Sequence, residues 1–158
     1  LPSITFWLMG SLATSNFSDL IKAALPMVIG VVPLYLLRWR INVLSFTEEE
    51  ALTMGIDTEK IRLLVIFSAT LITASAVSIS GVIGYVGLVI PHLARALVGP
   101  NFRVLIPISM LLGSIYLLLI DTVARVSLPM EIPLGIVTSI IGAPFFIYLL
   151  TRSGRGWK

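Results

Sequence analysis

Charged residues are scarce in this chain. Asp, Glu, Lys and Arg make up 12% of its 158 residues, whereas hydrophobic residues make up 57%. An ordinary soluble domain has about 25% charged and about 45–50% apolar residues, so too few charges are present here to cover a water-facing surface. The composition therefore argues against a soluble enzyme, a disordered chain and a coiled coil.

Cysteine is absent, and His92 is the only histidine. These absences exclude disulfides, thiolate nucleophiles, cysteine-ligated metals and a site with several histidines from this chain. The phosphate-binding loop pattern GxxxxGK followed by Ser or Thr is also absent, so ATP, if used, must bind another chain. We predict no catalytic residue, no metal site and no directly bound cofactor. No basic segment precedes an apolar core at the start, so we expect no signal peptide and expect a fragment.

Three long stretches contain no Asp, Glu, Lys or Arg. They cover residues 63–94, 104–120 and 132–151, which are 32, 17 and 20 residues long. A helix needs about 20 mostly apolar residues to cross a bilayer. The sequence therefore predicts an all-α integral membrane protein with about five transmembrane helices. The expected spans are residues 20–37, 61–80, 88–98, 104–120 and 134–150, and a glycine-rich break at 81–87 precedes the short third span.

Small residues recur at a spacing of four along the second expected span. Ala69 and Thr73 form one such pair, and Ala76, Ser80 and Gly84 continue the spacing. Small residues let helices approach closely in lipid. We interpret this face as a packing surface, and the alternative is that part of it lines a pore formed with partner helices.

Basic residues are distributed unevenly between the two sides of the predicted membrane. One side has only Lys22 and Arg125. The other side collects eight basic residues, which are Arg38, Arg40, Lys60, Arg62, Arg103, Arg152, Arg155 and Lys158. Because cytoplasmic loops carry an excess of Lys and Arg, we expect residues 41–60 and the C-terminus to be cytoplasmic and residues 127–133 to face outward.

The segment 41–60 contains five of the eight acidic residues and predicts a short amphipathic helix. Ser45 or Thr47 is a suitable N-cap, and the glutamates that follow fall in a favourable first turn. Gly55 is expected to end the helix in a left-handed conformation. The expected apolar face consists of Leu44, Ala51, Leu52 and Ile56. The segment is interpreted either as a solvated connector or as a docking helix for a cytoplasmic partner.

Arg95, Asp121 and Arg125 are the charged residues closest to membrane depth. Such residues usually face protein or water, because charges are costly in hydrocarbon. Asp121 and Arg125 are four residues apart on one helix, so we predict that they pair. Arg125 is then either half of a structural ion pair or a contact to something outside the cell. For His92, a packed or interfacial position is favoured over a proton relay.

The stretch GYVGLVIPHLAR at residues 84–95 resembles a signature of FecCD-type permeases, the membrane subunits of ABC importers for iron-siderophores, haem and cobalamin. Further similar segments follow in the family's order at residues 112–113, 121–125, 131–135 and 142–150. The positions that match the family's motifs, to which we assign structural roles, are Gly84, Gly87, Pro91, His92, Arg95, Asp121, Glu131, Pro133, Gly135, Gly142 and Pro144.

The resemblance implies an architecture and two contact sites. A family subunit has ten helices, and residues 1–158 resemble helices six to ten as one permease region. In the family, the loop matching residues 41–60 forms short coupling helices that sit on the ATPase. The matching residues here are Leu44, Thr47, Glu48, Glu49, Glu50, Ala51 and Gly55, with Thr47 in place of the usual glycine. Arg125 matches an arginine at the outer face that pairs with a glutamate of the substrate-binding protein.

The resemblance therefore implies a permease subunit of a binding-protein-dependent ABC importer for a metal chelate such as iron-siderophore, haem or cobalamin. It implies a multi-pass protein of the inner membrane of a prokaryote. The expected partners are an ABC ATPase that hydrolyses ATP, a binding protein, a second permease subunit and membrane lipid, but no nucleic acid. The alternatives are an ion-driven secondary transporter using Arg95, Asp121 and Arg125, or a fragment that does not transport.

Overall fold

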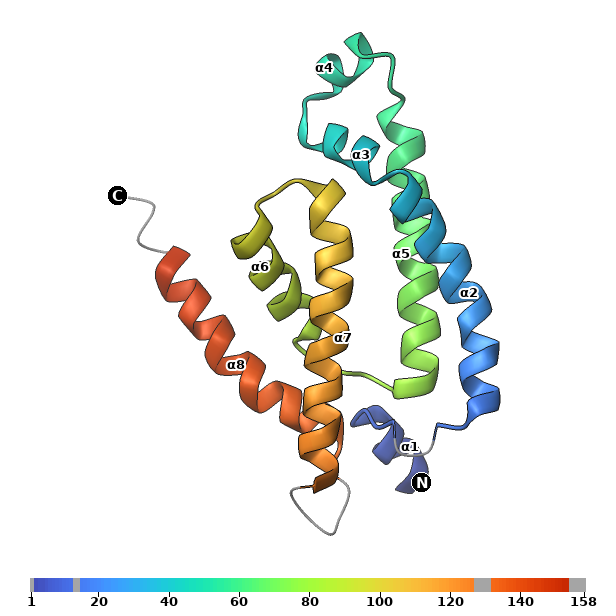
Figure 1. Cartoon of the computed structure of the whole chain (residues 1–158), viewed down its shortest axis with the longest axis vertical. Helices are drawn as coiled ribbons and strands as arrows, with labels where there is room; N and C mark the ends of the chain where they lie inside the picture. The colour runs from blue at the N-terminus through green and yellow to red at the C-terminus, as the bar shows by residue number, and fades with distance from the viewer. Residues whose placement is uncertain (1, 13–14, 127–131, 154–158) are drawn as a thin grey trace. The chain divides into compact units, whose positions relative to one another are not determined.

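The computed structural model describes residues 2–12, 15–126 and 132–153, and helices are the only regular secondary structure within them, which confirms the all-α fold class (Figure 1). The elements are α1 (Pro2–Leu8), α2 (Phe17–Leu36), α3 (Arg38–Ile41), the 3₁₀ helix η1 (Asn42–Ser45), α4 (Glu48–Thr53), α5 (Thr58–Ser80), α6 (Val86–Val98), α7 (Phe102–Val126) and α8 (Leu134–Ser153). The helix α2 ends one residue before the predicted stop at residue 37, and α7 continues beyond residue 120 to Val126.

Four helices of the described part are long and apolar enough to cross a membrane, namely α2, α5, α7 and α8. They correspond to four of the five expected spans. Only 11–17% of their most apolar windows are buried within this chain, so most of their surface must be covered by lipid or by other protein. The chain is thus a multi-pass membrane protein.

The remaining expected span is the short helix α6, which has 13 residues. At 1.5 Å per residue it is about 20 Å long, less than the hydrocarbon core of about 30 Å. The five non-helical residues before it, Gly81–Tyr85, reach about 16 Å further if extended. A third crossing therefore requires α6 and this segment together, and the topology with five crossings stays a prediction.

The chain divides into two compact units. The first contains described residues from 1–14, 80–97 and 109–158, and the second contains residues 15–79 and 98–108. The helix α7 begins in the second unit and ends in the first. The expectation that residues 1–158 act as one permease region stays a prediction.

In the first unit, hydrogen bonds of non-helical backbone join segments that are far apart in the sequence. The amide of Ser11 donates to the carbonyl of Ser80 at 2.9 Å, and the amide of Gly135 donates to the carbonyl of Met9 at 3.1 Å. Gly10 has a φ of 75°, and a Cβ atom there would lie 2.7 Å from the Val82 carbonyl oxygen. In lipid, non-helical backbone is tolerated only where protein buries it or where it lines a water-filled cavity. These contacts hold the start of the expected glycine-rich break, where Gly81 is buried, whereas Val82 and Gly87 are exposed.

The second unit packs α2 against α5 at Gly30. A Cβ atom at Gly30 would lie 2.6 Å from Cγ1 of Ile72 and 2.9 Å from the Ser68 carbonyl. The buried polar residues of α5 are Ser68 and Ser75, whereas Ala69 and Thr73 are exposed. Ala76, Ser80 and Gly84 are half-buried, so the predicted small-residue face is packed within this chain only in its later part. The two helices approach closely because α2 has a glycine, Gly30, at the contact. The spacing of small residues along α5 gives no information about that glycine.

Candidate functional site

The helix α4 begins with a capping box. Thr47 is its N-cap, because the amide of Glu50 donates to Oγ1 of Thr47 at 3.4 Å and the amide of Thr47 donates to Oε2 of Glu50 at 3.1 Å. This reciprocal pair satisfies two amides that the first turn leaves without partners. Of the two predicted caps, Thr47 is confirmed, and Ser45 instead ends η1.

The other end of α4 is closed by Gly55, which has a φ of 69°. The amide of Ile56 donates to the Ala51 carbonyl at 3.1 Å, and the amide of Gly55 donates to the Leu52 carbonyl at 3.0 Å. This is the Schellman arrangement, in which a left-handed residue satisfies the last carbonyls of a helix. The prediction for Gly55 is confirmed, and both ends of this six-residue helix are fixed by local sequence.

Only one side chain of α4 is fully buried, and it is Ala51. Leu44 is half-buried in η1. Leu52, which is expected on the apolar face, is not buried within this chain, because its side chain is 68% exposed. A helix of six residues has room for little more than one inward position. Exposed apolar and acidic side chains therefore lie together on this segment, and we define Phe46, Glu48, Glu49, Leu52 and Met54 as the α4 patch.

Two ion pairs lie close to the α4 patch. Glu48 approaches Nη2 of Arg62 at 3.7 Å, with both side chains more than half exposed, so this pair contributes little stability. Asp57 accepts from the amide of Lys60 at 3.2 Å and from its ammonium group at 3.0 Å. The hydrogen bond from the Lys60 side chain holds the pKa of Asp57 below its ordinary value, so this carboxylate stays charged at the start of α5.

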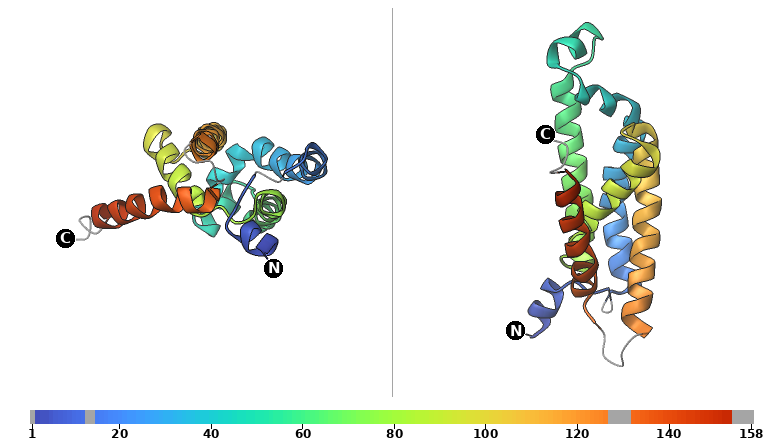
Figure 2. Two further views of the ribbon diagram at one scale, coloured as in Figure 1. Left: turned by 90° about the horizontal axis from the view of Figure 1, so that it is seen from below. Right: turned by 90° about the vertical axis from the view of Figure 1, so that its left-hand side faces the viewer.

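Sequence reasoning missed the link that holds this segment to α7. Nδ2 of Asn42 donates to Oδ1 of Asn101 at 2.9 Å, and the amide of Phe102 donates to Oδ1 of Asn42 at 2.8 Å. Gly99, Pro100 and Asn101 form a recognisable start for a helix, but nothing in the sequence near Asn42 indicates a partner 59 residues away. Figures 1 and 2 show α3, η1 and α4 gathered at the end of the second unit where α5 begins.

The opposite end of α7 carries the predicted ion pair. Nε of Arg125 lies 2.8 Å from Oδ2 of Asp121, which confirms the pairing. Arg125 remains half exposed, whereas Asp121 is 25% exposed. Ser11, Leu12 and the start of α8 lie around the pair at a narrow cavity. Asp121 thus holds the guanidinium at the surface of the first unit.

The motif residues of α6 divide into two faces. Val89, Ile90 and Ala94 are buried, whereas Pro91, His92 and Arg95 are exposed within the described part of the chain. The exposure of His92 agrees with the interfacial interpretation. Within residues 2–12, 15–126 and 132–153, His92 takes part in no ion pair.

The motif glycines differ in what surrounds them. A Cβ atom at Gly135 would collide with the Met9 carbonyl, and one at Gly142 would collide with the Tyr85 side chain. By contrast, Gly84 has its nearest neighbour, Oγ of Ser139, at 3.6 Å, and Gly87 has open space. Pro133 is buried before α8, Pro144 is exposed inside it, and Glu131 lies outside the described residues.

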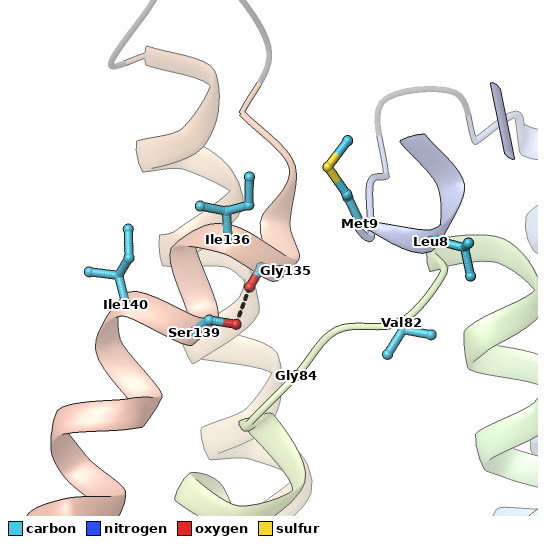
Figure 3. A pocket seen from close by; sticks show the side chains of 8 residues that line it. All are labelled: Leu8, Met9, Val82, Gly84, Gly135, Ile136, Ser139 and Ile140. Carbon is cyan, nitrogen blue, oxygen red and sulfur yellow. Dashed lines mark hydrogen bonds between the residues drawn. The ribbon is translucent and has the colours of Figure 1, made fainter. Parts of the chain in front are cut away.

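A cavity of about 520 Å³ lies beside the non-helical backbone of the first unit (Figure 3). Its lining consists of Leu8, Met9, Val82, Gly84, Gly135, Ile136, Ser139 and Ile140. Figure 3 shows the Ser139 hydroxyl turned onto the Gly135 carbonyl, to which it donates at 2.6 Å. The described lining is mainly apolar and offers no titratable side chain, so it is suited to packing or passage and not to acid–base chemistry.

The known proteins that resemble this chain are membrane components of transport systems. A family model described as the FecCD transport family matches residues 1–152. The chain is 45% identical over 151 residues to a probable iron chelatin transport system permease protein of Helicobacter pylori, covering 96% of this chain and 46% of that protein. It is 49% identical over 156 residues to the molybdate import system permease protein MolB of Haemophilus influenzae, covering 99% and 46%.

Two further comparisons extend this result. The cobalamin import system permease protein BtuC of Halobacterium salinarum is 47% identical over 146 residues, covering 92% of this chain and 39% of that protein. A solved structure of a metal-chelate type ABC transporter in an inward-facing conformation is 49% identical, with a TM-score of 0.91, over 96% of this chain and 49% of that one. The chain spans less than half the length of these relatives.

Proposed function

Because this chain belongs to the FecCD transport family, we propose that it forms the C-terminal half of a permease subunit in a binding-protein-dependent ABC importer. The observation that carries the proposal is the fold, which matches a metal-chelate type ABC transporter at a TM-score of 0.91 and 49% identity. The order of the family's motifs along the chain supports the assignment to the C-terminal half.

The proposed subunit performs no covalent chemistry, and ATP is hydrolysed on a separate ATPase. The α4 patch is the proposed contact for that ATPase, because exposed apolar side chains rimmed by charges are typical of protein interaction sites. Thr47 and Gly55 cap the two ends of α4. The hydrogen bonds between Asn42 and the start of α7 would carry a push on the segment 41–60 into a membrane-spanning helix.

The opposite end of α7 is the proposed contact for the substrate-binding protein. Arg125 offers a planar guanidinium, which matches a carboxylate better than an ammonium group does. Asp121 holds that group in place through a 2.8 Å contact. In this proposal the protein lies in the inner membrane of a prokaryote, with residues 41–60 and the C-terminus in the cytoplasm, and a second permease subunit completes the pathway.

The proposed cargo is a metal chelate, such as iron-siderophore, haem or cobalamin. Support comes from relatives that are named for iron chelatin and cobalamin, and from the metal-chelate transporter of similar structure. The relative named for molybdate has comparable identity. The identity of the cargo is therefore open to direct measurement with a panel of these compounds.

Uptake into proteoliposomes tests the proposal. For a complete permease that contains this chain as its C-terminal half, we expect uptake of a ferric chelate, haem or cobalamin only when the ATPase, its ATP and the binding protein are all present. A proton or sodium gradient should not replace ATP. Uptake driven by such a gradient without ATP would favour a secondary transporter, and failure of the chain to bind any ATPase would favour a fragment that does not transport.

A further inference from the structure

A cavity of about 500 Å³ lies where α2 ends and α3 begins, in the second unit. It is lined by Tyr35, Leu36, Arg38, Trp39 and Arg103. The chain leaves α2 at Leu37, and the amide of Arg40 donates to the Leu37 carbonyl at 2.8 Å, so α3 begins at once. This sharp bend brings an aromatic pair, an aliphatic side chain and two guanidinium groups to one hollow.

The two arginines give the cavity positive charge. The guanidinium of Arg38 lies 4.2 Å from the centre of the Tyr35 ring, an arrangement in which the ring face attracts and orients the cation. Arg103 lies in the first turn of α7, and its amide donates to Oδ1 of Asn101 at 3.0 Å. Across residues 15–126, the ion pairs of the structure involve neither Arg38 nor Arg103. The cavity is therefore suited to an anion.

The apolar part of the lining restricts what kind of anion fits. Leu36 is 67% exposed, Trp39 52% and Tyr35 44%. Tyrosine and tryptophan at the end of a membrane span are typical of the membrane–water boundary. A ligand that uses the whole lining needs a negative group for the arginines and hydrocarbon for Leu36 and Trp39. A free phosphate ion satisfies only the first requirement.

We propose that this cavity binds the phosphodiester group of an anionic phospholipid such as phosphatidylglycerol. Guanidinium groups donate paired hydrogen bonds to phosphate oxygens. Basic pockets beside membrane helices on the cytoplasmic side recognise such headgroups. In this arrangement the lipid phosphate lies between Arg38 and Arg103, and its chains run beside Leu36 along α2. The site requires only that α2 spans the membrane, and it does not depend on transport.

Quenching of Trp39 fluorescence tests this proposal. The Trp7→Phe/Trp157→Phe protein leaves Trp39 as the only tryptophan. It is placed in phosphatidylcholine vesicles that contain a small fraction of either brominated phosphatidylglycerol or brominated phosphatidylcholine. We expect stronger quenching by brominated phosphatidylglycerol. Replacing arginine by glutamine at positions 38 and 103 should lower this preference about fivefold for each charge removed.

A charge-matched control separates the site from general attraction to the membrane. Lys60→Gln/Arg62→Gln removes two basic residues from the expected cytoplasmic side without touching the cavity, and it should keep the preference. Arg103→Gln alone, at an exposed position, should still lower the preference about fivefold if the double variant folds poorly. Inorganic phosphate in excess should not abolish the preference.

Three results would overturn the proposal. One is that Arg38→Gln/Arg103→Gln and the control variant show the same preference for brominated phosphatidylglycerol over brominated phosphatidylcholine. Another is loss of the preference in the presence of inorganic phosphate, which would indicate a site for a free anion. The third is that Arg38→Gln/Arg103→Gln keeps the wild-type preference for phosphatidylglycerol but no longer binds the ATPase. That result would assign the two arginines to a protein interface. The quenching measurement does not involve ATP-dependent uptake. Failure of the lipid proposal can therefore be distinguished from failure of the proposed transport function.

Discussion

At Gly135 the first turn of α8 lies directly against the carbonyl of Met9, with no side chain to separate them. We predict that Gly135→Ala destabilises the protein by about 1–3 kcal/mol, the usual cost of overpacking. Gly87→Ala is the matched control, because its Cβ atom would meet open space. Alanine is favoured in a helix by up to about 1 kcal/mol over glycine, so this control should be neutral or stabilising.

Thermal unfolding of both variants in detergent provides the measurement for Gly135. The midpoint should fall for Gly135→Ala and hold or rise for Gly87→Ala. Equal midpoints would show that the backbone contact between Met9 and α8 does not contribute to stability.

Arg125 is the residue on which the proposed binding-protein contact depends. We predict that Arg125→Glu weakens binding of that partner by about tenfold, because like charges would then meet, and that Arg125→Lys weakens it less. The effect should shrink as salt rises, since the side chain is half exposed. Binding titrations at two salt concentrations measure it.

The alternative for Arg125 is a purely structural pair with Asp121. In that case Arg125→Glu and Asp121→Ala would lower stability alike, and Asp121→Arg would rescue Arg125→Glu within the chain. Rescue by a glutamate-to-arginine change on the binding protein would instead support docking.

At the scale of elements, the α4 patch makes a separate prediction. Glu48→Arg together with Glu49→Arg should weaken ATPase binding about 30-fold, since each exposed charge contact contributes up to about 1 kcal/mol and two are reversed. Insertion into the membrane should not change. Glu59→Arg, in the first turn of α5 and outside the patch, is the control. Co-purification of the ATPase at wild-type level with the double variant would exclude the patch as its docking surface.

The link between η1 and α7 makes a prediction about coupling. Asn42→Ala removes both hydrogen bonds to the start of α7, each of which contributes about 0.5–1.5 kcal/mol. We expect the ATPase to bind normally but fewer molecules to be transported per ATP hydrolysed. Asn42→Asp keeps the acceptor for the Phe102 amide and should be milder.

The ratio of cargo uptake to ATP hydrolysis measures coupling, and hydrogen exchange at residues 42–46 reports whether the link has loosened. Faster hydrogen exchange at residues 42–46 with an unchanged ratio of uptake to ATP hydrolysis would show that these hydrogen bonds do not couple the ATPase to transport.

Much of this architecture follows from local sequence. The spans are predictable because uncharged runs of helical length have no other stable environment. The ends of α4 are predictable because Thr47, Glu50 and Gly55 act within one short segment. The i,i+4 pair of Asp121 and Arg125 is predictable for the same reason.

Contacts between distant segments could not be predicted in this way. Asn42 and Asn101 meet only after the fold is formed, and Gly30 decides which face of α5 packs. Leu52 fits an apolar face by spacing, but α4 is too short to bury it. The partners of Gly10 and Gly135 likewise lie on other segments, so a glycine-rich break alone does not reveal what covers it.

At the scale of the whole molecule, the account requires the α4 patch and Arg125 to lie on opposite sides of the membrane. Between them the chain passes through α5, then Gly81–Tyr85 with α6, and then α7. Three crossings place the two sites on opposite sides, and two crossings place them on the same side. The short helix α6 therefore decides whether the two partners can bind as proposed.

The most direct measurement uses single cysteines, which is straightforward because the chain has none of its own. Thr53→Cys lies at the end of α4, and Val126→Cys lies at the end of α7, where the side chain is 80% exposed. With a thiol reagent that does not cross membranes, Thr53→Cys should be labelled only from the cytoplasmic side and Val126→Cys only from the outer side. Labelling of both from the same side would contradict the account.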